Sequence, residues 1–260
     1  MKPGQFNDKV VVVTGASRGI GQAICAAFGK QGATVVGVAR SDLAATAAAV
    51  SAAGGTFAAH KADLGSGTQS AAAAVIGAIL AKTGKIDALI NNAGIIRRAP
   101  AKDYSEQDWQ AVIATNLNSP FFLMQAVARW WIETGRAQAP AEARLKLVNI
   151  ASLLSFQGGI TVPAYAASKH ALAGVTKALA NEWARERINV NAIAPGYIVT
   201  ENTKALLADP VRNQAILDRI PEARWGQPVD IAEPVVFLAS PEADYMNGAI
   251  ISVDGGWLAR

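Results

Sequence analysis

A tyrosine and a lysine four residues apart could carry proton transfer in this chain. Tyr165 and Lys169 lie in an alanine-rich segment, and Ser152 precedes the tyrosine by thirteen residues. In a helix, residues i and i+4 share a face, so the phenol and the ammonium would be neighbours. A phenol titrates near pH ~10, and a nearby cation favours the phenolate. The spacing therefore predicts a tyrosine general acid or base, with a serine hydroxyl to hold a substrate oxygen.

The N-terminal region carries a glycine-rich turn of the kind that holds a phosphate. Residues 9–14 form a β-branched run typical of a buried strand, residues 15–21 have the spacing G-x-x-x-G-x-G, and residues 22–31 have helical periodicity. Glycines let the backbone approach a pyrophosphate, which the positive helix N-terminus attracts. Strand, turn and helix in this order predict a dinucleotide site.

Strand and helix signals alternate along the rest of the 260 residues. We expect a single doubly wound (Rossmann-type) α/β domain over residues 1–260, with a parallel sheet and helices on both faces. Further strands are expected at residues 34–39, 56–60, 88–91, 145–150, 189–194 and 249–253. Helices are expected at residues 43–53, 68–83, 106–134 and 164–186, with shorter ones after Thr203 and Val229.

Composition limits the classes of function. The formal charge of +4 is too small and too scattered to indicate nucleic-acid binding. A lone cysteine, Cys25, excludes an intrachain disulfide and leaves no zinc cluster, so no metal site is expected. We find no apolar signal core and no run of the ~18 apolar residues that span a bilayer, so we expect a cytoplasmic protein that binds a small molecule.

The chain as a whole resembles the short-chain dehydrogenase/reductase family. The resemblance implies a sheet of about seven strands, a homotetramer, and hydride exchange between a nicotinamide and a carbonyl or secondary alcohol. The residues that carry it, in the family's order and spacing, are Thr14-Gly15-x-x-x-Gly19-x-Gly21, Asp63, Asn91-Asn92-Ala93-Gly94, Asn116, Ser152, Tyr165-x-x-x-Lys169, Pro195-Gly196 and Thr200.

This resemblance assigns roles residue by residue. Tyr165 would exchange the proton, Lys169 would lower its pKa and bind the nicotinamide ribose, Ser152 would orient the carbonyl, and Asn116 would hold a relay water. The expected coenzyme contacts, besides Tyr165 and Lys169, are Gly15, Ser17, Arg18, Gly19, Ile20, Gly21, Arg40, Asp63, Leu64, Asn91, Ala93, Gly94, Pro195, Gly196, Ile198 and Thr200.

Several of these residues also have ordinary structural explanations. Asp63 could begin a loop as an Asx residue, although the resemblance places it on the adenine amino group. Asn116 could cap or bend a helix. His170 neighbours Lys169 but lies on another helix face, and His60 ends a strand, so neither is expected to act.

The choice of coenzyme depends on the end of the second strand. Family members that prefer NAD usually carry an aspartate at the position of Ala39. Here Arg40 follows, and Arg18 lies in the glycine turn, so two guanidiniums could bind a 2′-phosphate. We therefore favour NADP(H) slightly over NAD(H). The alternative is that both arginines are solvated surface cations.

A narrower resemblance concerns the substrate. The chain is similar to the branch of 2-deoxy-D-gluconate 3-dehydrogenases, also described as 2-dehydro-3-deoxy-D-gluconate 5-dehydrogenases, which implies a six-carbon deoxy sugar acid. That branch is mostly associated with NAD, in contrast to the arginines above. The matching segments are residues 94–98, 104–109, 152–159, 181–184, 219–226 and 253–257.

Cationic and polar residues near the coenzyme loop fit an acidic substrate. Arg98 could pair with a carboxylate, while Gln157 and Tyr197 could bind hydroxyls. Arg97 fits a surface or subunit contact equally well. Two alternatives stay open: a reductase of another carbonyl, such as a 3-oxoacyl thioester, and a non-catalytic dinucleotide-binding protein. Because the four catalytic residue types are all present, an enzyme is the expected class.

Overall fold

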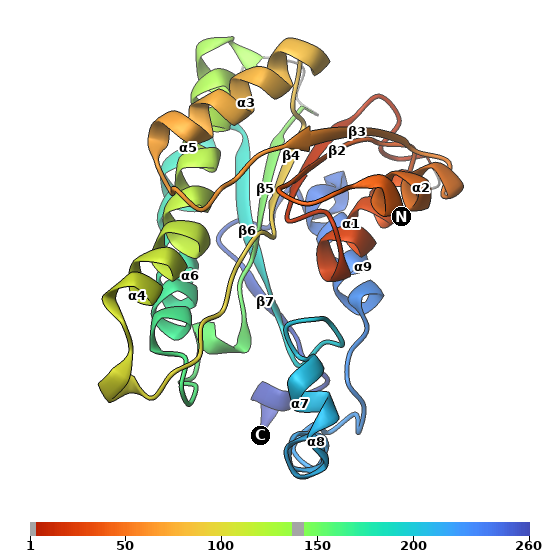
Figure 1. Ribbon diagram of the computed structural model, residues 1–260. Helices are drawn as coiled ribbons and strands as arrows, with labels where there is room; N and C mark the ends of the chain where they lie inside the picture. Colours follow the sequence, from red (N-terminus) through yellow and green to blue (C-terminus); the bar gives the residue numbers. More distant parts are fainter. Residues whose placement is uncertain (1–3, 137–142) are drawn as a thin grey trace.

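The fold is built on a parallel sheet in which every strand is short and largely apolar. The computed structural model describes residues 4–136 and 143–260. Seven strands pair in the order β3-β2-β1-β4-β5-β6-β7, all parallel, as Figure 1 shows. They are β1 (Val10–Thr14), β2 (Thr34–Ala39), β3 (Thr56–Lys61), β4 (Ala88–Asn91), β5 (Leu145–Ile150), β6 (Ile188–Pro195) and β7 (Ile250–Val253).

Helices connect successive strands and cover both faces of the sheet (Figure 1). This confirms the predicted doubly wound Rossmann-type domain, with element bounds within a few residues of those expected. The helices are α1 (Gly19–Lys30), α2 (Ala44–Ala52), α3 (Gln69–Thr83), α4 (Glu106–Ile113), α5 (Ser119–Glu133), α6 (Pro163–Trp183), α7 (Lys204–Ala208), α8 (Pro210–Leu217) and α9 (Pro228–Ala239).

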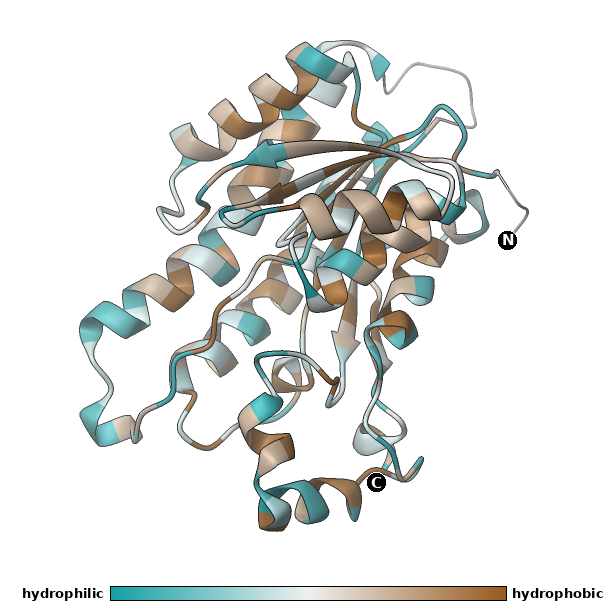
Figure 2. Cartoon of the chain, turned by 45° about the vertical axis from the view of Figure 1, so that its right-hand side comes forward, coloured by the Kyte–Doolittle hydropathy of each residue, from teal (hydrophilic) through white to brown (hydrophobic). Residues whose placement is uncertain are grey.

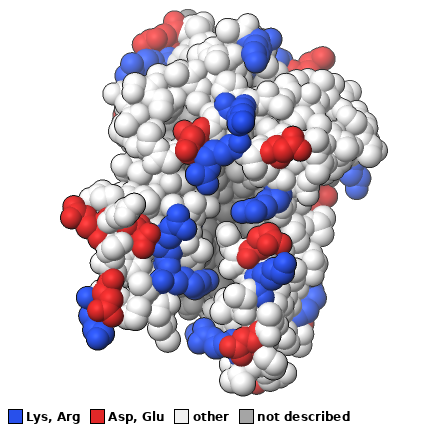
Figure 3. Space-filling view, in the orientation of Figure 1, with Lys and Arg blue, Asp and Glu red and all other residues white. Residues whose placement is uncertain are grey.

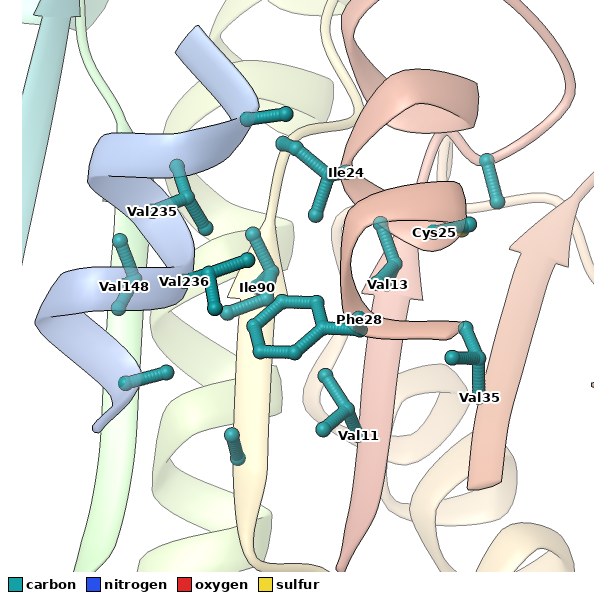
Figure 4. Packing of buried hydrophobic residues seen from close by; sticks show 14 of the residues in the cluster. Val11, Val13, Ile24, Cys25, Phe28, Val35, Ile90, Val148, Val235 and Val236 are labelled. Atoms are coloured by element: carbon teal, nitrogen blue, oxygen red, sulfur yellow. The ribbon is translucent and has the colours of Figure 1, made fainter. Parts of the chain in front are cut away.

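Alternation along the strands divides the apolar residues between two cores. In β1, Val11 and Val13 pack with residues of α1, α2 and α9, whereas Val10 and Val12 pack with residues of α3, α5 and α6. Figure 4 shows the first core, where the Phe28 ring projects from α1 toward Val236 of α9. Successive strand residues point to opposite faces, so a sheet covered on both sides requires continuous apolar runs. The brown of the strands in Figure 2 reflects these runs.

Cys25 belongs to the core shown in Figure 4 and is fully buried. Burial raises the pKa of its thiol to about 12. A thiol that stays protonated at neutral pH is a poor nucleophile, so this cysteine has a packing role.

The helix predicted over residues 106–134 is present as one helical segment, Glu106–Glu133, with a change of helical type inside it. A π-helical turn, Ala114–Asn118, separates α4 from α5 and contains Asn116. The segment Glu106–Glu133 is long and apolar enough to cross a membrane by length and composition, which corrects the expectation that no such run exists. Half of its apolar window is buried in the fold, where α5 packs against α3 and the sheet. This is the behaviour of a core helix.

The strand order reverses between β1 and β4. One set of connections runs from β1 toward β3, and the other runs from β4 toward β7. At such a switch point the loops after the two strands separate and leave a crevice beyond their carboxyl ends. The glycine turn follows β1 and residues 92–94 follow β4, so both lie at this crevice.

Candidate active site

The glycine turn leaves room for a ligand because its backbone is closely packed from behind. Gly15 has φ +64°, and a Cβ there would lie 2.8 Å from the Asn92 Nδ2 atom. A Cβ on Gly21 would lie 2.2 Å from the Gly15 carbonyl oxygen. Arg18 precedes α1, and within the described residues its side chain does not cap the helix. The first amides of α1 are therefore available to an anion.

Asn92 and Thr14 hold the two loops of the crevice together. The Asn92 amide donates to the Thr14 and Gly15 carbonyl oxygens at 3.0 and 3.1 Å. The Thr14 hydroxyl oxygen accepts from the backbone N–H of Asn92 and of Ala93, both at 3.0 Å. Both residues belong to the motifs found in the sequence. Their hydrogen bonds to each other were not predicted, because they join segments 78 residues apart.

A cavity of about 590 Å³ opens at this crevice. Figure 3 shows Lys and Arg side chains around the hollow in this face of the molecule. The predicted residues that line it are Gly15, Ser17, Arg18, Gly19, Ile20, Gly21, Arg40, Asp63, Leu64, Ala93, Gly94, Ser152, Tyr165, Lys169, Pro195, Gly196, Ile198 and Thr200. A cavity at the strand ends that is lined by both a glycine turn and a tyrosine–lysine pair suits a dinucleotide.

Further lining residues were not predicted. They are sequence neighbours of predicted ones, and that proximity was the available signal. They are Val38, Ala39, Ser41, Ala62, Gly65, Asn92, Ile95, Ala111, Thr115, Ile150, Ala151, Glu201, Asn202 and Thr203.

Asn91 does not line the cavity, although it was expected to lie against the coenzyme. It is 2% exposed, and its amide donates to the Asn149 Oδ1 atom at 3.0 Å and to the Pro120 carbonyl oxygen at 3.4 Å. The Asn91 side chain is thus buried inside the fold, where its hydrogen bond to Asn149 links β4 to β5.

Tyr165 and Lys169 lie on the first turns of α6, as their spacing predicts. The Lys169 Nζ atom lies 5.6 Å from the centre of the Tyr165 ring and donates to the Ile150 carbonyl oxygen at 2.6 Å. Ser152, just after β5, hydrogen-bonds the Tyr165 side chain and also accepts from the Leu154 N–H at 3.2 Å. The phenol, ammonium and serine hydroxyl therefore meet at one wall of the cavity.

Asn116 reaches this group indirectly. Its amide donates to the Ile95 carbonyl oxygen at 2.9 Å and accepts from the Ile95 N–H at 2.8 Å. It also donates to the Ser168 hydroxyl at 3.3 Å. Asn116 is fully buried, and Ile95, rather than Asn116, lines the cavity. The π-helical turn thus connects the loop after β4 with α6.

Enclosure dominates the electrostatics of the pair. Desolvation raises the pKa of Tyr165, while the Ser152 hydrogen bond and the Arg98 guanidinium act in the opposite direction. Burial lowers the pKa of Lys169 to about 8. The sequence suggested that the ammonium would set the tyrosine's pKa, but in the structure desolvation is the largest cause for both groups. Both shifts favour the uncharged form of the group, because burial disfavours a charge.

Two of the residues proposed for the substrate, Ser152 and Tyr165, line the large cavity. The other three, Arg98, Gln157 and Tyr197, lie outside its lining. Arg98 has no ion pair within the described residues, but its charge acts on Tyr165. The Gln157 Oε1 atom accepts from the Trp257 indole at 3.2 Å. Tyr197 stacks against Trp257 at 4.8 Å between ring centres and lines a smaller cavity of about 160 Å³.

Arg97, whose role was left open, lines the large cavity. Its Nε atom lies 3.4 Å from the Asp108 carboxylate, and the Tyr104 hydroxyl donates to its carbonyl oxygen. The Arg97 guanidinium is therefore engaged by Asp108, whereas the charge of Arg98 acts on the pKa of Tyr165.

Comparison with known proteins matches this geometry. A family model described as short chain dehydrogenase matches residues 9–210. A 2-dehydro-3-deoxy-D-gluconate 5-dehydrogenase of Dickeya dadantii is 49% identical over 252 residues, which cover 97% of this chain and 96% of that protein.

Solved structures agree. An Agrobacterium tumefaciens protein provisionally assigned as a 2-deoxy-D-gluconate 3-dehydrogenase, crystallised with bound NADP, is 48% identical with a TM-score of 0.90 and full coverage of both chains. A Beutenbergia cavernae protein provisionally assigned as an NAD(P)-dependent gluconate 5-dehydrogenase, with NADP at low occupancy, is 44% identical with a TM-score of 0.90 and full coverage of both chains. With its glycine turn, its tyrosine–lysine pair and these relatives, this chain is an oxidoreductase and belongs to the short-chain dehydrogenase family.

Proposed function

We propose that this protein exchanges a hydride between a nicotinamide coenzyme and the carbonyl or secondary alcohol of a deoxy-keto sugar acid. A single catalytic domain over residues 1–260 would carry the reaction. The supporting observation is the meeting of Tyr165, Lys169 and Ser152 at the wall of the dinucleotide-shaped cavity. The class of substrate is supported by the relatives, which act on a 2-dehydro-3-deoxy or 2-deoxy gluconate by name.

Some residues of this chain would transfer the proton, and others would position the substrate. The Tyr165 Oη atom would donate a proton to the substrate oxygen during reduction and accept it during oxidation. The Ser152 hydroxyl would orient that oxygen, and the Lys169 ammonium would stabilise the phenolate. Asn116, through Ile95 and Ser168, would hold the wall in place. A bound nicotinamide would supply or take the hydride.

The coenzyme would lie across the strand ends. Its pyrophosphate would rest on the backbone of Gly15, Gly19 and Gly21, where added Cβ atoms at the first and last would meet backbone or side-chain atoms within 3 Å. We favour NADP(H) over NAD(H), because Ala39 replaces an acidic residue and both Arg18 and Arg40 line the cavity. The related structures crystallised with NADP support this preference.

A spectrophotometric screen tests the proposal. Each coenzyme is paired with deoxy-keto sugar acids, neutral ketones and a 3-oxoacyl thioester, and reduced nicotinamide is followed at roughly 340 nm. We expect turnover with the sugar acids and NADPH. Tyr165→Phe should lower kcat by about 10²- to 10⁴-fold while coenzyme binding is retained. Full turnover by the phenylalanine variant, or turnover of the thioester alone, would contradict the proposal.

Arg98 is proposed to bind the substrate carboxylate. Arg98→Ala should raise KM for a sugar acid by about tenfold or more, as expected for loss of a charge-assisted contact, and should leave KM for a neutral ketone nearly unchanged. Arg97→Ala is the matched control, because Arg97 is engaged by Asp108. Equal effects of Arg98→Ala on acidic and neutral substrates would rule out the carboxylate contact.

We also propose that the enzyme is a cytoplasmic homotetramer. Strand β7 is an edge strand whose residues are only partly covered within the chain, and Tyr245 and Phe237 are exposed nearby in sequence. Uncovered sheet edges and apolar side chains favour association with another copy. Light scattering coupled to size-exclusion chromatography should give about four times the 27.0 kDa chain mass. A monomeric mass would contradict it, as would recovery of the protein outside the cytoplasmic fraction.

A further inference from the structure

Asp63 and Arg40 interact at the part of the cavity that follows β2 and β3. The Arg40 Nη1 atom lies 3.8 Å from the Asp63 Oδ2 atom. The other carboxylate oxygen, Oδ1, accepts from the Gly65 N–H at 2.8 Å, which fixes the carboxylate on its loop. Both residues line the cavity, so a ligand that uses Arg40 meets an arginine already shared with a carboxylate.

Arg18 differs from Arg40 in this respect. It lines the same cavity, and it makes no ion pair with any residue of 4–136 or 143–260. A 2′-phosphate carries close to two negative charges at neutral pH. It would therefore find one available guanidinium, at Arg18, and one partly neutralised guanidinium, at Arg40. The affinity for a coenzyme without that phosphate would not depend on whether Arg40 is neutralised.

We propose that Asp63 sets the coenzyme preference of this enzyme by restraining Arg40. The carboxylate competes with the 2′-phosphate for the guanidinium and so holds the preference for NADP(H) below the value that two free arginines would give. This inference rests on the proposed coenzyme site and adds a specificity-determining residue to it. The pair is about two-thirds exposed, so the effect is modest: exposed ion pairs change affinities by about two- to fivefold.

Asp63→Asn tests the proposal, because it removes the charge and keeps an acceptor oxygen for the Gly65 N–H. Dissociation constants for NADPH and NADH are measured from reduced-nicotinamide fluorescence, without substrate. We expect the ratio of NADPH affinity to NADH affinity to rise by about two- to fivefold in the variant. The adenine, which the resemblance places near Asp63, is common to both coenzymes, so a change in that contact cancels in the ratio. Asp42→Asn is the matched control: it is an equal charge change near Arg40 in sequence, its carboxylate accepts from the Ala44 N–H, and it does not line the cavity.

The effect must also depend on Arg40. In an Arg40→Gln background, Asp63→Asn should no longer raise the ratio of NADPH affinity to NADH affinity. The proposal is overturned if NADPH and NADH affinities change by the same factor, if Asp42→Asn has an equal effect, or if the gain persists without Arg40. Absence of any binding by either coenzyme would instead overturn the proposed function, so the two failures can be told apart.

Discussion

Lys169 carries a charge in a place with little solvent. The residue is 4% exposed. Within the described residues its ammonium donates one hydrogen bond, to the Ile150 carbonyl oxygen. Burial of an ammonium disfavours its charged form, which is why its pKa falls to about 8. The amine nevertheless remains mostly protonated at neutral pH, as stabilisation of a phenolate at Tyr165 requires.

This burial has a consequence for stability that depends on pH. The folded pKa of about 8 lies below the 10.5 of the unfolded chain, so below pH 8 both states are protonated and the cost of burying the charge is constant. Between pH 8 and 10.5 the unfolded chain keeps a proton that the folded protein has released. The contribution of Lys169 to the free energy of unfolding therefore rises with pH in this window.

Urea denaturation of the parent protein and of Lys169→Met at pH 8 and pH 10 measures this contribution. The difference in free energy of unfolding, parent minus variant, should increase by about 1–3 kcal/mol between the two pH values. Groups distant from Lys169 cancel in that difference. A difference that stays constant, or falls, would contradict the assigned direction.

At the scale of elements, the position of α6 is fixed by polar contacts to β5. Lys169 bonds Ile150, and two turns later the Thr176 hydroxyl accepts from the Asn149 amide at 3.0 Å. The Ser155 hydroxyl, in the turn after Ser152, donates to the Lys169 carbonyl oxygen at 2.8 Å. Helix α6 and the strand that leads to Ser152 are thus joined at several points, which sets the Tyr165 phenol against the Ser152 hydroxyl.

The glycine turn shows a second constraint at this scale. Gly21→Ala would place a Cβ 2.2 Å from the Gly15 carbonyl oxygen, so backbone must move. We expect a loss of about 2–4 kcal/mol in stability, with weakened coenzyme binding. Gly77→Ala is the control: it lies exposed in α3 with nothing within 4 Å of its Cβ, and should gain about 0.5–1 kcal/mol.

Thermal denaturation and coenzyme titration of the two alanine variants compare these glycines directly. If Gly21→Ala were as stable as the parent protein and bound coenzyme normally, close packing behind the turn could not explain the need for glycine there. A destabilised Gly77→Ala would show that helix propensity does not decide the outcome in α3.

At the scale of the whole molecule, the segment around α7 and α8 packs apart from the two sheet cores. Ile216 of α8 forms a smaller cluster with Trp225 and with Trp257 near the C-terminus. Leu153, which follows Ser152, belongs to the same cluster. Figure 1 shows α7 and α8 beyond the carboxyl ends of the strands. Leu153 therefore connects this segment to Ser152 at the wall of the large cavity.

Low burial should make this segment open more readily than the sheet. None of the residues of α7 is buried, and α8 buries only Ile216, whereas every residue of β5 and β6 is buried. Amide hydrogen exchange followed by mass spectrometry should be at least about tenfold faster in residues 204–217 than in β5 and β6. Equal protection in both regions would mean that the segment is integral to the main core.

The sequence by itself determined the elements and the chemistry each could offer. β-Branched runs, glycine spacing and the four-residue interval between Tyr165 and Lys169 depend on local geometry, which a sequence states directly. The doubly wound parallel sheet followed from the alternation of strands and helices, and its seven strands followed from the family resemblance.

Tertiary structure decided which partners each side chain takes. Only the folded chain pairs Arg97 with Asp108, brings Arg40 to Asp63, turns Gln157 toward Trp257 and encloses Asn91 between strands. It also placed a π-helical turn, which contains Asn116, inside the helix that the sequence predicted. Most of these contacts join residues far apart in the chain, and they depend on packing and burial, which local periodicity does not encode.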